Sequence, residues 1–413
     1  MLPYQAVIHF GYFVLRHDGQ LFPAGDDWGP TADMRKPGVS LGVKNGTEGI
    51  VAGIVKGAGA MRKGFDALVI VDQQPAAGPR NPLPAALVQA VIVALETPPP
   101  RGGPPTIQAL WNDKRFVGIW NKLIIRPATE TFHEFLIEVP LKGTFGEAWY
   151  KGEMAKAAEA DRHIVVRWLK AFREQQGKHL PANHKKGQVF AAPTTGEITE
   201  LIALAHDLYL LQKVDRLPDS LVNRLRNHDG FQGARYEIAI AAAFVKCDFD
   251  IEWIGDLPVK HPEFVARNKQ TREQVAVETK SRRRPGVLNQ LGTLPPPENL
   301  SADVDRLYRE ALGQDMGNHP FAIFLDVNLP PSTASSAVAG WQREIVGRWR
   351  ANEQLALLGF TNFAWHYSGT GPTLYPEFIL ATPPTSVRPL ATQKTVEQLR
   401  TTLENYGVFP LEY

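Results

Sequence analysis

Two charged residues at the end of an apolar stretch, Glu278 and Lys280, are the first sign of chemistry in this sequence. They close the segment QVAVETK at 274–280, whose alternation of apolar side chains predicts a β-strand. Successive side chains of a strand point to opposite faces, so Glu278 and Lys280 share a face with Ala276. An unpaired charge there is costly, so the two groups either pair with one another or serve a bound metal ion and its water.

Two more glutamates favour the metal interpretation. Glu263 lies in the segment before QVAVETK, and the polar turn NKQTRE joins the two segments into a predicted β-hairpin that brings Glu263 near Glu278. Two carboxylates close to one point repel unless a cation lies between them. Glu237 precedes Ile240 by three residues and Phe244 by seven, a spacing that places its carboxylate on or beside the buried face of a predicted helix. A third acid is therefore expected to point inward.

The elements that must position these residues follow one another within about a hundred residues. Their predicted order is helix, strand, strand, strand, helix, strand. The corresponding ranges are 233–247, 250–254, 262–267, 274–280, 302–314 and 321–329.

This order and three short motifs resemble the PD-(D/E)xK nuclease superfamily. The motifs are GARYEIAIAAAF, HPEFVAR and VAVETKSRRR, and the resemblance covers about a quarter of the chain. It implies an α/β fold with a restriction-endonuclease-like core, in which a mixed central sheet is flanked by helices.

The resemblance also implies roles for the charged residues. In that superfamily the acid after the proline and the first acid of the ExK strand hold a divalent metal ion, with help from a strand carbonyl. The matching groups are Glu263, Glu278 and the carbonyl of Thr279. Lys280 would orient or deprotonate the attacking water, and Glu237 would support the metal shell through water. The expected ion is Mg²⁺, with Mn²⁺ as the alternative, and the implied reaction is hydrolysis of phosphodiester bonds.

One position departs from the family pattern. The residue after Pro262 is Glu263, where the family most often has aspartate. Asp256, in the loop WIGDLPVKHPEF, is the alternative second metal ligand. The departure also leaves open a second hypothesis, in which the protein is a catalytically silent nucleic-acid-binding or assembly protein that retains the nuclease fold.

Positive charge is concentrated around these motifs. Between Lys260 and Arg284 there are eight basic and three acidic residues, a local net charge of +5, whereas the whole chain carries +2. Such a run is more often a solvated face than a binding surface. Beside a metal site, however, Arg282, Arg283 and Arg284 are suited to contact nucleic-acid phosphates. We expect a nucleic-acid partner, DNA rather than RNA, and by analogy a role in restriction or antiphage defence.

The length of 413 residues predicts more than one domain. Strand-like runs separated by glycine- and proline-rich breaks predict a strand-rich, mixed α/β N-terminal domain of unassigned role at 1–176. We place a linker and helical connector at 177–228, and the nuclease-like domain with C-terminal elaborations at 229–413.

Further elements are expected outside the motifs. They are strands at 134–141 (EFLIEVPL), 363–368 (FAWHYS) and 377–382 (EFILAT), and helices at 147–173, 197–214, 218–227, 340–358 and 394–407.

Cysteine usage and hydropathy bear on the compartment. Cys247 is the single cysteine and cannot form an internal disulfide, which predicts a reducing, cytoplasmic environment and a small buried hydrophobe at this position. The N-terminus lacks the pattern of a signal peptide, and the longest apolar stretch, 83–95, is too short to span a bilayer. We expect no membrane association. Double-strand cleavage usually requires two active sites, so a homodimer or a partner protein is a further expectation.

Overall fold

The computed structural model describes eight strands between Tyr4 and Pro127, and then the chain from residue 128 to residue 410 with short gaps. The gaps are 186–187, 215–216, 256–258, 297–298, 301–303, 331–339, 341–342, 344, 348, 350–352 and 372–376.

The described backbone before residue 128 forms two antiparallel sheets. The first has the order β3-β2-β1-β5-β4, with β1 Tyr4–Ile8, β2 Phe13–Arg16, β3 Leu21–Pro23, β4 Gly49–Ala52 and β5 Leu68–Gln73. The second has the order β6-β7-β8, with β6 Gln108–Trp111, β7 Lys114–Ile119 and β8 Lys122–Pro127. Strands thus dominate the described part of this region, as its sequence predicts.

A six-stranded mixed sheet forms the centre of the rest of the chain, in the order β14-β13-β12-β11-β10-β9. The strands are β9 Phe249–Trp253, β10 Phe264–Asn268, β11 Gln274–Ser281, β12 Phe321–Asp326, β13 Leu355–Asn362 and β14 Glu377–Ala381. Strands β9, β10 and β11 pair antiparallel, β11, β12 and β13 pair parallel, and β14 is antiparallel to β13. The predicted mixed central sheet is confirmed.

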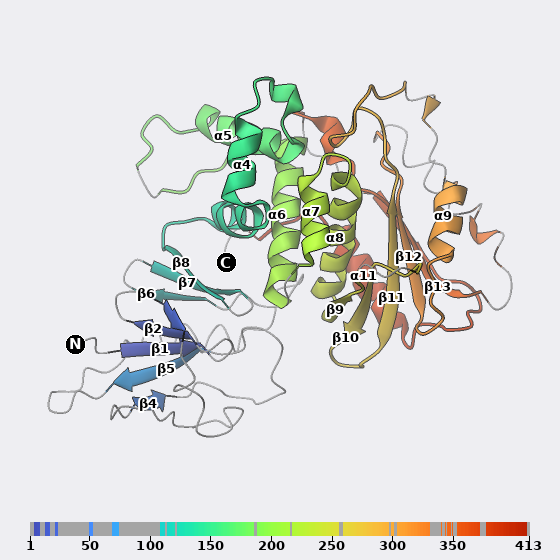
Figure 1. Cartoon of the computed structure of the whole chain (residues 1–413), viewed down its shortest axis with the longest axis horizontal. Coiled ribbons are helices and arrows are strands. Elements are labelled where there is room, and N and C mark those ends of the chain that lie inside the picture. The colour runs from blue at the N-terminus through green and yellow to red at the C-terminus, as the bar shows by residue number, and fades with distance from the viewer. Residues whose placement is uncertain are drawn as a thin grey trace.

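Helices cover both faces of this sheet (Figure 1). Helix α8 (Phe231–Lys246) packs on one face and α9 (Val304–Leu312) on the other. Val275 and Val277 of β11 belong to the core on the α8 side, whereas Ala276 belongs to the core on the α9 side. This alternation agrees with the period of two read from the sequence, and the order from α8 to β12 agrees with the predicted order of elements.

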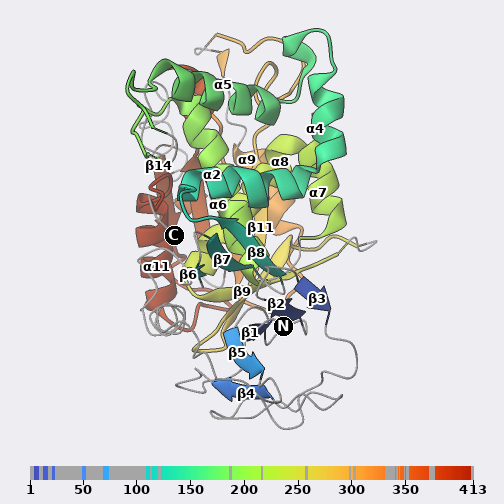
Figure 2. The ribbon, with the colours of Figure 1, turned by 90° about the vertical axis from the view of Figure 1, so that its left-hand side faces the viewer.

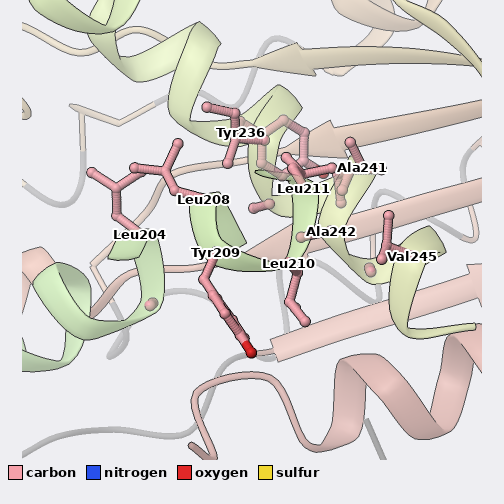
Figure 3. Packing of buried hydrophobic residues seen from close by; sticks show 14 of the residues in the cluster. Leu204, Leu208, Tyr209, Leu210, Leu211, Tyr236, Ala241, Ala242 and Val245 are labelled. Carbon is pink, nitrogen blue, oxygen red and sulfur yellow. The ribbon is translucent and has the colours of Figure 1, made fainter. Parts of the chain in front are cut away.

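The larger of the two cores is built around helix α6 (Gly196–Val214). Nearly all residues of this helix are buried, including the polar Glu200, His206 and Asp207, so it lies inside the domain and has no solvent face. Figure 3 shows Leu204, Leu208 and Leu211 of α6 beside Tyr236 and Ala241 of α8. The two helices form the main helical layer next to the sheet.

Further helical segments flank α6 in the sequence. They are α2 Phe132–Leu136, η2 Ile137–Leu141, α3 Lys142–Phe145, α4 Glu147–Met154, η3 Glu159–Asp161, α5 Ile164–Lys178 and α7 Asp219–Arg226. The helical run from α2 through α3 crosses α6 (Figure 2). One core cluster extends from Val117 to Tyr406, so packing crosses the boundaries that we expected at 176 and 228. No helix in the described residues is long and apolar enough to cross a lipid bilayer.

The predicted strand EFLIEVPL is wrong, because the segment is helical in α2 and η2. Thr131 caps the helix and Glu134 returns the contact to the backbone of Thr131, which forms a capping box. Phe132, Phe135 and Leu136 are buried at a spacing of three and four residues. The buried face therefore follows the period of a helix, which the apolar run alone does not reveal.

Two C-terminal predictions also need correction. The expected helix at 340–358 overlaps β13, which begins at Leu355 and is buried along its whole length. A strand buried on both faces has no alternating pattern, so it resembles a helix segment in sequence. The expected strand FAWHYS is a short 3-10 helix, η5 (Trp365–Ser368). Strand β14 and helix α11 (Gln393–Glu404) confirm the other two C-terminal predictions.

Candidate active site

Glu278 is buried in β11, and its side chain has no exposed surface. One carboxylate oxygen, Oε1, forms an ion pair with Nζ of Lys280. The two residues therefore share a face of the strand, as their spacing predicts. The other oxygen, Oε2, is buried and has no hydrogen-bond partner among the described residues. A buried carboxylate oxygen without a partner is costly, so it is an open position for a cation or a proton.

Glu263 lies beside Glu278 at the open end of the hairpin. Its backbone N–H donates to the carbonyl of Val277 at 3.0 Å, and the next residue, Phe264, pairs with Val277 in the sheet register. The Glu263 side chain is half-buried. The hairpin thus brings the two predicted metal-binding carboxylates to the same end. Asp256, the alternative ligand, lies outside the described residues.

The three acids of the site influence one another electrostatically. Burial raises the pKa of Glu278 to about 8, with Lys280 acting in the opposite direction. Burial also raises the pKa of Glu237 to about 7, and the negative charge of Glu263 acts in the same direction. Glu263 and Glu237 both add to the increase at Glu278. At neutral pH, burial therefore favours the protonated form of Glu278.

Glu237 is buried in α8, as its helical position predicts, and it has a partner that sequence analysis missed. Both of its oxygens accept hydrogen bonds from the guanidinium of Arg224 in α7. The Arg224 side chain is 44% exposed and that of Glu237 is 6% exposed, so the pair connects the interior to the surface. Arg224 stands in the last turn of an amphipathic helix, where basic residues are ordinary, so its sequence position gave no signal.

The side chain of Thr279 is buried, and its hydroxyl has no hydrogen-bond partner among the described residues. The role of its carbonyl as a metal ligand stays a prediction. Cys247 is buried, as expected, and its Sγ lies 3.2 Å from Oγ1 of Thr402. Burial raises the pKa of the Cys247 thiol to about 12, which keeps it protonated and unreactive.

The three arginines after β11 occupy different environments. Arg283 is exposed and Arg282 is half-buried. Arg284 is buried, and its guanidinium donates to the carbonyls of Asn328 and Val327. Arg284 therefore fixes the chain after the strand, and only Arg282 and Arg283 remain candidates for phosphate contacts.

A buried polar network, also missed by sequence analysis, holds the segment that follows Lys280. Nε2 of Gln232 in α8 donates to Oγ of Ser281 at 3.0 Å, and that hydroxyl donates to Oδ2 of Asp326 at 3.0 Å. Nδ2 of Asn328 donates to the carbonyl of Arg282 at 2.9 Å. These residues come from three separate elements, and only the fold reveals that they meet.

A second buried ion pair is connected to this network through Asn328. Glu200 of α6 pairs with Arg235 of α8, and its other oxygen lies 2.8 Å from Nδ1 of His366. Nε2 of His366 lies 2.9 Å from Oδ1 of Asn328. His366 therefore has a structural partner on each ring nitrogen, which explains its burial.

The donor set at Glu278 fits a hard divalent cation. Within the described residues, no group of three or more histidine, cysteine, aspartate or glutamate side chains is arranged to hold a metal ion. Magnesium usually binds through one or two carboxylates and keeps several water ligands. The unpartnered Oε2 of Glu278 and the neighbouring Glu263 offer such a pair.

Comparisons of the chain with protein-family models, with curated proteins and with solved structures find no match. The function has to be argued from the side chains themselves.

Proposed function

We propose that this protein is a metal-dependent nuclease that hydrolyses phosphodiester bonds, in DNA rather than RNA. The observation that supports this most is the state of Glu278. Its buried carboxylate has one oxygen paired with Lys280 and the other without a hydrogen-bond partner within the described part of the chain, next to a second carboxylate at the end of the same hairpin. A restriction-endonuclease-like core and a role in restriction or antiphage defence belong to the same proposal, and the latter rests on analogy.

Each residue has a distinct task in this mechanism. Glu278 and Glu263 would hold Mg²⁺ or Mn²⁺, which when bound lowers the pKa of water and offsets negative charge on the phosphate. Lys280, placed beside Glu278, would orient the attacking water, whose oxygen bonds to phosphorus as the bond from phosphorus to the leaving sugar oxygen breaks. The proton that the water loses balances the one that the leaving oxygen takes up. Glu237 would orient outer water molecules. Arg282 and Arg283 would contact the phosphates on either side.

The second candidate is a silent module that binds nucleic acid without cutting it. It is favoured because the charged side chains of the site already form ion pairs with one another. Lys280 is paired with Glu278, and Glu237 is paired with Arg224. Such pairs stabilise a fold without any metal. A silent module would bind nucleic acid equally well with and without divalent cations.

Cleavage assays distinguish the two candidates. We expect plasmid or single-stranded DNA to be cut in the presence of Mg²⁺ or Mn²⁺, with RNA as a parallel substrate. The Glu278→Gln and Lys280→Ala variants should each lose at least about a hundredfold in rate, the scale of a lost acid–base or metal contribution.

The exposed pair Glu147 and Lys151 provides matched controls, because it has the same charges on the surface of α4. Glu147→Gln and Lys151→Ala should cleave at the wild-type rate. Binding of nucleic acid by the wild type without metal-dependent cleavage of any substrate would favour the silent module.

A further inference from the structure

The loop between β11 and α9 contains a closed turn, Pro285–Gly292, which we call the tip loop. The N–H of Gly286 donates to the carbonyl of Gln290 at 3.0 Å, and the N–H of Gln290 donates to the carbonyl of Val287 at 2.9 Å. Gly286 has a φ of +72°, and a Cβ there would come within 2.8 Å of the carbonyl oxygen of Gly292. The loop is therefore compact and depends on glycine at its closure.

The tip loop is anchored on two sides. Val287 and Leu288 are buried in the larger core. Oδ1 of Asn289 accepts a hydrogen bond from the N–H of Ile164, the first residue of α5, at 2.7 Å. Nε2 of Gln290 donates to the backbone carbonyls in the turn between α7 and α8. These contacts fix the loop next to the helices that carry Arg224 and Glu237.

The backbone of the loop is strained at two successive positions. Leu288 has a φ of 45° and Asn289 a φ of 70°, which place both residues in the left-handed region. Asparagine tolerates this region, but leucine rarely adopts it. Strain of this kind persists only where the surrounding contacts determine the conformation, and it concentrates at functional sites.

This fixed loop presents an apolar side chain to solvent. Leu291 is 89% exposed, more than any other large hydrophobic residue in the described part of the chain. The exposed Arg283 stands at the base of the loop, directly after the strand that carries Lys280. An apolar tip and a cationic base thus lie together, close in sequence to the proposed active site.

We propose that the tip loop is the base-contacting element of the nucleic-acid interface, with Leu291 inserting against the bases of a strand whose phosphates Arg283 contacts. This inference rests on the proposed function, and it adds how the substrate is held. Apolar side chains that enter between bases unstack them, and a base face gains stability when an apolar surface covers it. Because the backbone of the loop is already fixed, binding would cost little backbone conformational entropy.

The test uses DNA and RNA oligonucleotides that carry 2-aminopurine, whose fluorescence rises when the base is unstacked. Binding is measured with Mg²⁺ in the Glu278→Gln background, where cleavage is expected to be lost. The parent should bind and raise the fluorescence. Adding Leu291→Ser should weaken binding roughly tenfold and abolish the rise, whereas Leu291→Trp should bind at least as tightly as the parent.

Val387→Ser is the control, because Val387 is also an exposed aliphatic residue. It should match the parent in affinity and fluorescence. Equal binding and equal fluorescence for the parent and Leu291→Ser would overturn the role of the loop while leaving the proposed nuclease intact. A change of oligomeric state in Leu291→Ser would overturn the proposed role of the tip loop, because Leu291 would then contact another copy of the chain. Absence of any nucleic-acid binding, together with absence of cleavage by the wild type, would overturn both proposals.

Discussion

Glu278 is the residue at which burial, charge and hydrogen bonding conflict most directly. Its carboxyl group is fully enclosed, one oxygen has no hydrogen-bond partner among the residues that the structure describes, and its pKa is raised to about 8. Under the proposed function, this site would exchange a proton for a metal ion as the pH rises, because metal binding requires the ionised carboxylate. The charge state of Glu278 thus links stability, metal binding and the proposed reaction.

The first prediction concerns pH. The folded-state pKa values of Glu237 and Glu278, about 7 and about 8, lie above the value of an unfolded glutamate. Between roughly pH 4.5 and these values the folded state holds protons that the unfolded state has released. Stability therefore falls as pH rises, by up to about 1.4 kcal/mol per pH unit for each carboxyl group.

Chemical denaturation from pH 5 to pH 8 measures this effect. Glu278→Gln should flatten the decrease, whereas Glu147→Gln on the surface should leave it unchanged. Magnesium should stabilise the wild type most at pH 8 and should not stabilise Glu278→Gln. An identical pH profile for the wild type and Glu278→Gln would contradict the prediction.

The second prediction concerns Arg224. Removing it leaves Glu237 buried beside Glu263 without its cation, and a buried charged group that loses its partner costs about 1–3 kcal/mol. Because protonation of Glu237 relieves this cost, Arg224→Ala should destabilise the protein more at pH 8 than at pH 5. Urea unfolding at the two pH values measures the difference.

Arg306→Ala is the control for Arg224→Ala, since Arg306 forms a half-exposed pair with Glu310 on α9. It should change stability little at either pH. The double variant Arg224→Ala, Glu237→Gln should recover most of the stability lost at pH 8. An equal loss at both pH values would show that Arg224 acts through packing alone.

At the scale of elements, the parallel strands β12 and β13 leave no room for a larger side chain at Gly359. Phe324 pairs with Gly359 in the register, and a Cβ on Gly359 would lie 2.5 Å from the Phe324 ring. Gly359→Ala should therefore destabilise the sheet by about 1–3 kcal/mol through overpacking. Thermal unfolding measures the loss. Gly152→Ala, on α4 with open space around it, should not destabilise the protein.

Elements with a regular period could be predicted from the sequence. The alternation in QVAVETK gave both the strand β11 and the common face of Glu278 and Lys280. The spacing around Glu237 gave its burial in α8. Both predictions depend on local geometry, which repeats every two residues in a strand and every 3.6 in a helix.

Features that depend on distant partners could not be predicted. β13 is buried on both faces, so its apolar run carries no period, and its first four residues fall within the helix expected at 340–358. Arg224 and Glu237 come from different helices, and Asn328 and Gln232 meet only at the end of β11. The spacing of such residues in the sequence does not indicate that they are in contact.

At the scale of the whole molecule, one core joins parts of the chain that we expected to be separate. Helix α6 precedes residue 229, yet it packs along α8 and its Glu200 pairs with Arg235. A fragment of residues 229–413 would expose this face of α8 and would lack Glu200, the ion-pair partner of Arg235. We expect the fragment to unfold without cooperativity, or to aggregate, as measured by near-ultraviolet circular dichroism and calorimetry.

A fragment of residues 128–413 is the comparison, because it keeps α6 and nearly all of the larger core. It should unfold in a cooperative transition. Cooperative unfolding of the 229–413 fragment, at the temperature of the longer one, would instead establish an independent domain at the boundary that sequence analysis placed.

The hydrogen bond from Tyr406 to Asp207 joins residues 199 positions apart, near the end of the chain and in its central helix. During synthesis, β11, which carries Glu278, leaves the ribosome before β12 and β13, the strands that continue the sheet beyond it. Contacts between distant residues form slowly, because the chain must first close long loops. The buried environment of Glu278 is thus complete only after β12 has been synthesised and has paired with β11. Under the proposed function, the site that would hold the metal ion is therefore assembled only after the strands that follow β11 have been made.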